Sequence, residues 1–231
     1  MTPERYAKVK AVLNKRQKDL TVLMDEVNKP HNLAAIVRTC DAVGVGHAHA
    51  IAPSKRLRLG NNTTSGSTKW VRVDTHADID SAAKILRAQG MQLVCTQLSD
   101  RSVDFREIDY TKPTCIIVGA EKFGVSEATA AAADHHVIIP MDGMVQSLNV
   151  SVATAIVLYE AERQRREKGF YDSPQLDSEI YQKLMTEWLH PRVSAYCQKH
   201  GLPYPPLKDD GELAHNPGEL EVEEKPEDGE Y

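Results

Sequence analysis

The sequence is poor in cysteine and has no long apolar run. Its four cysteines, Cys40, Cys95, Cys115 and Cys197, are widely spaced and form no Cys-x-x-Cys pair, so neither structural zinc nor the disulfide framework of a secreted protein is expected. No apolar signal region stands at the N-terminus, and serine and threonine interrupt the longest apolar stretch, residues 150–158. We therefore expect a cytoplasmic protein without a membrane span.

Several common catalytic signatures are also missing. The segment 119–126 resembles a phosphate-binding loop, but Val125 stands where a Walker loop requires lysine, which disfavours a nucleoside triphosphatase. Neither a Gly-x-Gly-x-x-Gly dinucleotide motif, a Gly-x-Ser-x-Gly elbow nor a His-Glu-x-x-His helix occurs. The adjacent His135 and His136 precede an expected strand, and we interpret them as surface residues rather than ligands. No metal site is expected.

Positive charge is concentrated at one end of the chain. The 231 residues include 28 Lys+Arg and 33 Asp+Glu, a net charge of −5. Residues 1–74 hold 13 basic and 6 acidic residues, a net +7, whereas residues 208–231 hold 2 and 10, a net −8. The basic end could face a nucleic-acid phosphate backbone. The alternative is that its lysines and arginines are ordinary solvent-exposed residues on helix surfaces, without a nucleic-acid partner.

Short Val/Ile runs alternate with helical patterns, which predicts an α/β fold with a parallel sheet covered on both faces. The expected strands are residues 20–24, 49–52, 70–73, 92–96, 115–118 and 137–139. The expected helices are residues 3–17, 33–43, 78–88, one from about 126, a long one ending near 168, and then 175–189 and 191–199. This pattern suggests a basic N-terminal helix (1–19), a central domain (20–170), a helical extension (171–207) and a disordered acidic tail (208–231).

The loops that follow expected strands are candidate ligand sites. In open α/β sheets, ligands bind beyond the carboxyl ends of the strands, which here are Met24, Val118 and Ile139. Two of these loops combine glycine with apolar side chains, an arrangement that suits an adenosyl ligand without strong phosphate capture. Ser147 and Asn149 then lie at a helix start, where helix capping explains one of them but not both.

Three segments together resemble a known family. They are Asn32-Leu-Ala-Ala-Ile-Val-Arg38, the stretch Ile-Val-Gly-Ala-Glu-Lys-Phe-Gly at 117–124, and Ile-Ile-Pro-Met-Asp-Gly-Met-Val-Gln-Ser-Leu-Asn-Val-Ser at 138–151. They resemble the three motifs of the SpoU (TrmH) branch of the SPOUT RNA 2'-O-ribose methyltransferases. Residues 5–6, 16–17, 104–110 and 201–204 resemble its tRNA-specific members. The resemblance covers residues 1 to about 207, and Phe123 departs from the small or polar residue expected in that loop.

The resemblance implies both a fold and an activity. The fold would be a parallel-sheet SPOUT domain with a deep C-terminal trefoil knot, flanked by N- and C-terminal helices, in a homodimer with active sites beside the subunit interface. The activity would be transfer of a methyl group from S-adenosyl-L-methionine to the ribose 2'-hydroxyl of guanosine 18 in the D-loop of tRNA, with neither DNA nor a membrane as partner. Methylation of ribosomal RNA and a catalytically silent RNA-binding module are the alternatives.

Arg38 is the residue that the resemblance places nearest to the reacting oxygen. The family is proposed to use it as a base, but a guanidinium has a solution pKa of roughly 12.5–13.8. We therefore favour electrostatic stabilisation of the developing alkoxide, with a base role only if the cationic cofactor and burial depress that pKa. The alternative is that Arg38 merely pairs with Asp41, three residues further along the same helix.

The resemblance assigns roles to further residues. Those implied at the catalytic centre, beside Arg38, are Asn32, Glu121, Ser147 and Asn149. Those whose backbone groups are implied around the adenosyl moiety are Thr96, Gly119, Ile139, Met141 and Leu148. For phosphate contacts to tRNA we expect arginines of the first helix, of the loop at residues 53–67 and of the long helix that ends near residue 168. They are Arg5, Arg16, Arg56, Arg58, Arg163 and Arg166.

Overall fold

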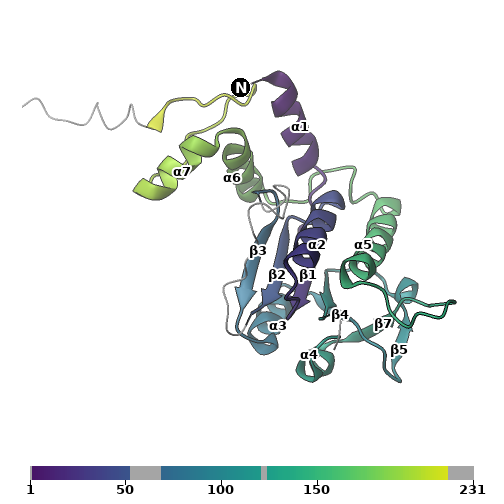
Figure 1. Cartoon of the computed structure of the whole chain (residues 1–231). Coiled ribbons are helices and arrows are strands. Elements are labelled where there is room, and N and C mark those ends of the chain that lie inside the picture. The colour runs from purple at the N-terminus through teal and green to yellow at the C-terminus, as the bar shows by residue number, and fades with distance from the viewer. Residues whose placement is uncertain (1, 53–68, 121–123, 218–231) are drawn as a thin grey trace, which may run out of the picture. The chain divides into compact units, whose positions relative to one another are not determined.

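The computed structural model describes residues 2–52, 69–120 and 124–217, which form two compact units. The larger unit is continuous in sequence and runs from Arg16 to Ser173. The smaller unit combines residues 2–15 with residues 174–217. Figure 1 shows the elements of both units along the chain. None of the described helices combines the length and the apolarity that crossing a bilayer requires.

The larger unit is built on a parallel seven-stranded sheet, as the alternation of apolar runs predicts. Its strands are β1 (Leu20–Asp25), β2 (His47–Ile51), β3 (Arg72–His76), β4 (Gln92–Thr96), β5 (Ser102–Asp104), β6 (Thr114–Val118) and β7 (His135–Ile138). They lie in the order β3-β2-β1-β6-β4-β7-β5, and every neighbouring pair is parallel. Strands β1 and β6 are buried along their whole length, which explains their continuous apolar sequences.

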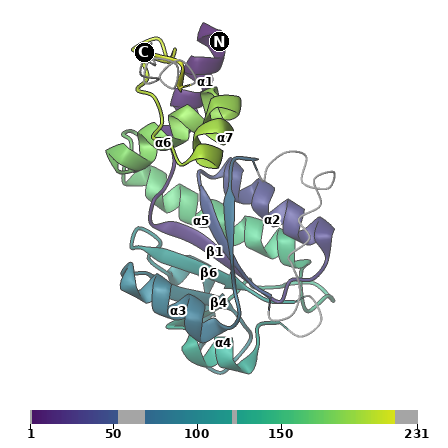
Figure 2. The ribbon, with the colours of Figure 1, turned by 90° about the vertical axis from the view of Figure 1, so that its left-hand side faces the viewer.

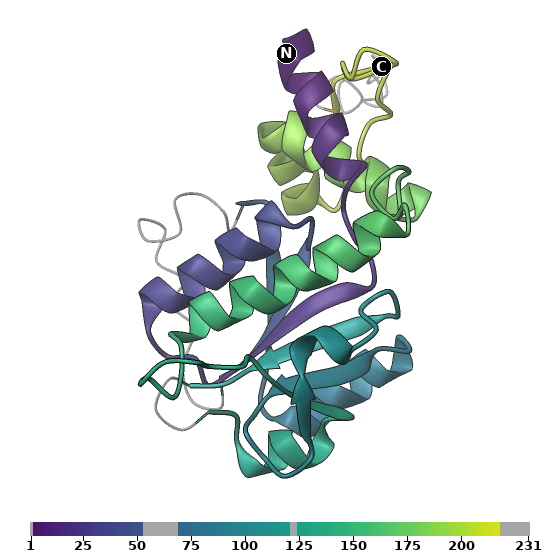
Figure 3. The ribbon, with the colours of Figure 1, turned by 90° about the vertical axis from the view of Figure 1, so that its right-hand side faces the viewer.

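Helices cover both faces of this sheet. Helices α2 (Pro30–Ala42) and α5 (Val150–Glu167) lie side by side on one face (Figure 3), and α3 (Ile79–Ala88) and α4 (Glu127–Ala132) lie on the other (Figure 2). Each face of the sheet has its own hydrophobic core, and alternate residues of β1 pack into the two cores. Val22 packs beneath α2 and α5, whereas Leu23 packs beneath α3. Strand side chains alternate between faces, so this division follows from the strand geometry.

The sheet edges differ from the sequence-based prediction. Strand β5 and the 3-10 turn η2 (Phe105–Glu107) lie in a stretch predicted to be irregular, and β3 begins at Arg72 rather than Trp70. Both edge strands are largely polar, and polar residues are weak strand signals that only pairing with a neighbour can override. His136 is also buried rather than at the surface: its Nδ1 lies 2.8 Å from Ser99 Oγ.

The smaller unit brings together the two ends of the chain. It contains α1 (Pro3–Leu13), α6 (Ser178–Leu189) and α7 (Pro191–His200), and α1 packs against α6. The apolar face of α1 buries Val9 and Leu13, and Arg5 Nη2 donates to the carbonyl oxygen of Trp188 at 2.7 Å. Residues 2–15 and 174–207, which belong to segments that the sequence presents as separate appendages, therefore share a core.

Part of the segment expected to be disordered takes up a defined structure. Leu207 and Leu213 form an antiparallel bridge, and His190 Nε2 donates to the carbonyl oxygen of Gly211 at 2.8 Å. Gly211 has a φ of 79°, a left-handed conformation that glycine adopts without strain. A turn held by contacts to a distant helix end is not visible in composition, so the sequence alone did not indicate it for residues 208–217.

The four cysteines are buried free thiols. Burial raises the pKa of Cys40 to about 12 and that of Cys95 to about 11. Because the thiolate is the reactive form, these side chains behave as small apolar groups in the core.

A buried arginine fixes the C-terminal end of α5. Arg165 is 0% exposed, and its guanidinium donates to Asp19 Oδ1 at 2.6 Å. Further acceptors are the carbonyl oxygens of Asp19 (3.1 Å), Tyr110 (2.8 Å) and Lys112 (3.0 Å) and Gln17 Oε1 (3.2 Å). One side chain thus ties α5 to the segment that enters β1 and to the segment that enters β6.

We predict that Arg165→Met lowers the free energy of unfolding by about 3 kcal/mol, because it leaves a carboxylate and several carbonyls without their donor. Urea denaturation followed by circular dichroism measures this change. Arg163→Ala is the matched control, since Arg163 is half-exposed and pairs with Glu160 and Glu167 on the same helix; its effect should stay below about 1 kcal/mol. Equal effects of the two substitutions would contradict the assignment.

Candidate functional site

The carboxyl ends of four adjacent strands form one edge of the sheet. Met24 of β1 pairs with Val118 of β6, and on β4 Cys95 pairs with Ile117 and Thr96 with Val137 of β7. The loops that follow β1, β6 and β7 therefore begin at neighbouring positions, although the first is far from the other two in sequence. This is the juxtaposition on which the sequence-based prediction of the site depends.

An amide pair joins the first and third of these loops. Asn149 caps α5, since its Oδ1 accepts from the backbone N–H of Ser151 at 2.8 Å. Its Nδ2 donates to Oδ1 of Asn32, a buried side chain on α2, at 3.2 Å. Asn149 thus provides the expected helix cap and also links two motifs that lie 117 residues apart. Ser147 lies exposed in the loop before it.

Arg38 lies on the exposed side of α2. It follows Asn32 by six residues, which on an α-helix is about 9 Å along the axis and about 240° around it. The side chain therefore leaves α2 from a different face than Asn32. Oδ1 of Asp41, its alternative partner, accepts from Nη2 of Arg16 at 2.5 Å. The Asp41 carboxylate thus binds an arginine in the interior of the fold.

The loop after β6 closes as a tight turn. The backbone N–H of Gly124 donates to the carbonyl oxygen of Ala120 at 2.8 Å, and Gly124 has a φ of 69°. A Cβ on Gly119 would lie 2.0 Å from the backbone C and O of Gly124. Glycine at 119 is therefore a steric requirement of this turn. Glu121, predicted to be catalytic, and Phe123 lie outside the described residues.

A buried carboxylate braces the same turn from β1. Asp25, the last residue of β1, is 2% exposed, and its Oδ2 accepts from the backbone N–H of Ser126 at 2.8 Å. Ser126 in turn caps α4 by accepting from the N–H of Thr129. Sequence analysis missed Asp25, although an acidic residue that directly ends an apolar strand is a usable signal.

The loop 139–149 has the polarity of a site for an uncharged ring system. Ile139, Met141 and Leu148 are partly exposed there, and Asp142 is the only charged residue of the segment. Thr96 at the end of β4 turns its hydroxyl toward the carbonyl oxygen of Ile117, at 3.4 Å, so its ligand contacts would come from the backbone. A loop without lysine or arginine does not fit a phosphate-bearing cofactor.

One of the predicted tRNA contacts lies buried in the larger unit. Arg16 is 1% exposed and also donates to the carbonyl oxygens of Val45 and Trp70, each at 3.1 Å. Its guanidinium is bonded inside the fold, because the Asp41 carboxylate and the carbonyl oxygens of Asp41, Val45 and Trp70 surround it. Arg56 and Arg58 lie outside the described residues.

The other predicted tRNA contacts occupy exposed positions and have protein partners. Arg163 pairs with Glu160 and Glu167, and Arg166 pairs with Glu162, all on α5. Hydrogen bonds that both guanidinium groups donate to these carboxylates raise their pKa values. Such exposed pairs are weak, so a phosphate could compete for either arginine.

We predict that Gly119→Ala weakens S-adenosyl-L-methionine binding by about tenfold or more, because the added methyl group forces the turn apart at a cost of about 1–3 kcal/mol. Isothermal titration calorimetry measures the affinity. Gly143→Ala is the control, since a Cβ at Gly143 would have no neighbour within 4 Å, and it should bind almost normally. Unchanged affinity in a folded Gly119→Ala protein would show that this turn lies away from the ligand.

The chain is similar to proteins of known function over most of its length. Residues 19–159 match the SpoU rRNA methylase family and residues 163–216 match the SpoU rRNA methylase C-terminal family. The tRNA (guanosine(18)-2'-O)-methyltransferase of Escherichia coli is 50% identical over 215 residues, which cover 92% of this chain and 94% of that protein.

Solved structures agree with this similarity. The Aquifex aeolicus TrmH/SpoU tRNA-modifying enzyme superposes with a TM-score of 0.76 at 48% identity, covering 82% of this chain and 97% of that one. A SpoU methyltransferase of Streptomyces viridochromogenes, in complex with the cofactor AdoMet, superposes with a TM-score of 0.59 at 27% identity, covering 66% and 59%. With its parallel sheet, its strand-end loops and these matches, the chain belongs to the SpoU methylase family.

Proposed function

We propose that the protein transfers a methyl group from S-adenosyl-L-methionine to the ribose 2'-hydroxyl of guanosine 18 in the D-loop of tRNA. The observation that carries this proposal is the meeting of the three motif loops at the ends of β1, β6 and β7, with Asn149 bonded to Asn32. The half-identical E. coli relative, named for this reaction, supports the choice of nucleotide.

The residues at the strand ends fit the cofactor. S-adenosyl-L-methionine supplies an electrophilic methyl group on a sulfonium, and it carries no phosphate. The tight turn at Gly119 and the partly exposed side chains of Ile139, Met141 and Leu148 would enclose its adenosyl part. Because the methyl group is already activated, the protein has to align the acceptor and exclude water.

We assign to Arg38 the stabilisation of the 2'-oxygen. As that oxygen attacks the methyl carbon and releases its proton to water, negative charge develops on it, and a guanidinium placed beside it would lower the energy of that charge. The carbon–sulfur bond would break in the same step, and its electron pair would neutralise the sulfonium. The Asn32–Asn149 pair holds α2 against the start of α5 and so orients the face on which the ribose would lie. Ser147, exposed in the same loop, and Glu121 are proposed to contact the substrate or Arg38.

The strand order supports a knotted connection. Strand β7 lies beyond β4, yet α5 returns to pack against α2 and β6. The chain between them, residues 139–149, therefore has to cross the ends of β4 and β6, where the loop after β6 also lies. We propose that this crossing forms the deep trefoil knot of the SPOUT fold.

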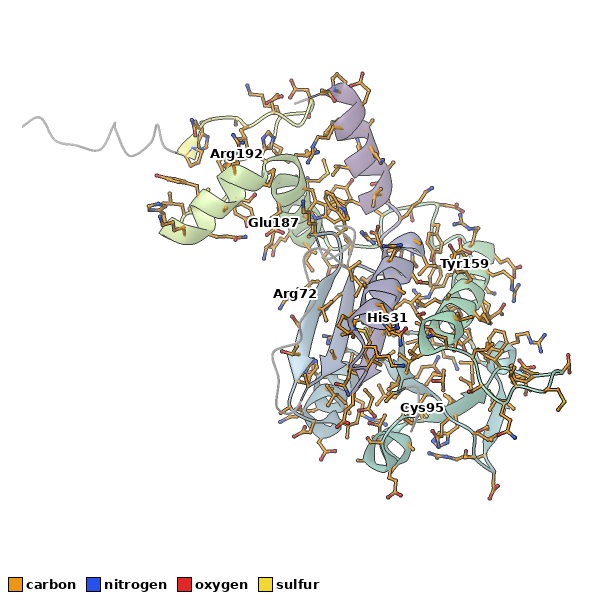
Figure 4. All side chains as sticks on the ribbon, in the orientation of Figure 1. His31, Arg72, Cys95, Tyr159, Glu187 and Arg192 are labelled. Atoms are coloured by element: carbon orange, nitrogen blue, oxygen red, sulfur yellow. The ribbon has the colours of Figure 1, made fainter. Side chains whose placement is uncertain are left out.

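An apolar stripe on α5 supports a homodimer. Val152, Ile156 and Tyr159 recur at helical spacing on the outward side of α5, where Val152 is 47% and Tyr159 is 53% exposed. Figure 4 shows Tyr159 on this helix. Met144 and Val145 of the neighbouring loop are exposed as well. We propose that a second copy covers this stripe, and that Arg38 of one chain then completes the site formed by the loops of the other.

We further propose that the enzyme acts in the cytoplasm and contacts the tRNA backbone through exposed arginines. Arg5 on α1, Arg163 and Arg166 on α5, and Arg56 and Arg58 remain candidates for this role. Their phosphate contacts would be individually modest and sensitive to salt.

Incubating the protein with tRNA and S-adenosyl-L-methionine labelled with tritium in the methyl group should place the label on the ribose of guanosine 18. Arg38→Ala should reduce labelling by about a thousandfold, in line with the removal of one electrostatic stabiliser, while calorimetry still detects cofactor binding. Label on ribosomal RNA only would show that ribosomal RNA is the substrate. Absence of label on any RNA would show that the protein is an RNA-binding module without catalysis.

The dimeric arrangement predicts complementation between two impaired variants. Arg38→Ala and Gly119→Ala chains, coexpressed with different affinity tags and purified through both, should regain up to half of the wild-type activity when S-adenosyl-L-methionine is limiting. One site of that heterodimer would combine an intact Arg38 from one chain with an intact Gly119 turn from the other. At the same limiting concentration, each variant alone should have little activity. Persistent inactivity of the purified heterodimer would place both groups in the same chain.

A further inference from the structure

Four titratable side chains gather at the β2–β3 end of the sheet, two strands away from β6 and its loop. His47 and His49 lie on β2, and Asp74 and His76 lie on β3. Each pair is two residues apart, so all four side chains lie on one face of the sheet, the face that α3 covers. On this face of the sheet, β2 and β3 carry these polar side chains, whereas the neighbouring strands carry apolar ones.

We propose that His47, His49 and Asp74 form a binding site for one divalent transition-metal ion, with zinc as the ion that fits the donors best. The ligand atoms offered by these three residues all lie within 4.8 Å of one another. Two imidazole nitrogens and one carboxylate oxygen form a donor set that suits zinc, whereas magnesium and calcium require oxygen ligands. A fourth position would remain for water.

The distances require only small side-chain movements. His47 Nε2 lies 3.0 Å from Asp74 Oδ2, and the rings of His47 and His49 have centroids 4.3 Å apart. With bonds of about 2.0–2.1 Å, the ligand atoms of a tetrahedral zinc ion lie about 3.3 Å apart. Closing the largest separation from 4.8 Å to that value is within the reach of χ rotations on two rigid, paired strands.

Neighbouring side chains already orient the proposed ligands. His76 Nε2 lies 3.0 Å from His49 Nδ1, and Arg72 Nε donates to Asp74 Oδ1 at 2.8 Å, so Oδ2 faces His47. Metal ligands commonly depend on such outer hydrogen bonds, which fix the ring and carboxylate orientations. Arg72, at the outer strand (Figure 4), is 72% exposed, so water screens its charge from the proposed ion.

A simple ion pair accounts for only part of the cluster. The contact between His47 and Asp74 could be a surface pair, but His49 beside them is 2% exposed. Its ring contacts His76 through Nδ1, and the ligand atoms that His47, His49 and Asp74 can offer lie close enough together for one metal ion to bind all three residues. The proposed ion would cross-link β2 and β3, and we expect it to stabilise the sheet without taking part in methyl transfer.

The test uses full-length protein without a histidine tag, freed of metal by EDTA. Titration with Co²⁺ should produce the intense visible absorption of a four-coordinate site, saturating at about one ion per chain, and Zn²⁺ should abolish that absorption. Zn²⁺ should also raise the melting temperature progressively, since it binds the folded state. His47→Gln and Asp74→Asn, both at half-buried positions, should each weaken binding roughly tenfold or more.

His135→Gln is the matched control, because His135 is an exposed histidine at the start of β7, and it should bind both ions like the wild type. Circular dichroism checks that each variant is folded. The proposal is overturned if Co²⁺ gives only the weak absorption of six-coordinate ions, if Zn²⁺ leaves the melting temperature unchanged, or if His47→Gln and Asp74→Asn bind as well as the control.

Discussion

Parallel pairing of β1, β6, β4 and β7 is the constraint on which the candidate site depends. Because these four strands run in the same direction, their carboxyl ends meet, and the segments that follow them begin side by side. A shift of register by one residue would turn every side chain of a strand to the other face, moving Asp25 away from Ser126. The alternating burial of Val22 and Leu23 beneath different helices prevents that shift. Core packing thus determines the geometry of the loops.

The sequence predicted the central strands better than the edges, for a physical reason. Strand β4 has the predicted bounds, Gln92–Thr96, because a strand buried on both faces needs a continuous apolar run. Strand β5, Ser102–Asp104, is short and polar and was not predicted. At the site, capping of α5 by one of Ser147 and Asn149 was predicted from their position, and Asn149 is the residue that caps. The bond from Asn149 to Asn32 could not be predicted, because it depends on how α2 and α5 pack.

Charge alone did not distinguish structural arginines from those available to RNA. Arg16 and Arg165 are both buried, each surrounded by carbonyl oxygens and one carboxylate. For Arg165 a signal was present: Leu158, Ala161 and Arg165 recur at the spacing of one helix face, and the first two are buried. An arginine that continues an apolar stripe is expected to reach into the core. Arg16 offers no such periodicity, since it lies in a short connection where only the three-dimensional fold decides which acceptors are near.

Helix α5 carries both the amide bond to α2 at the candidate site and the buried arginine that binds the segments entering β1 and β6. Its 18 residues span about 27 Å, with Asn149 at the end that faces the strand-end loops and Arg165 at the buried end. Because both ends are bonded to other elements, the helix cannot slide along its axis without breaking one of them. Its inward face fills the core beside α2, whereas Val152 and Tyr159 on its outward side leave an apolar surface. A second chain that packs on this surface would therefore approach a site whose own geometry is already fixed, and it would add a side chain without displacing the loops.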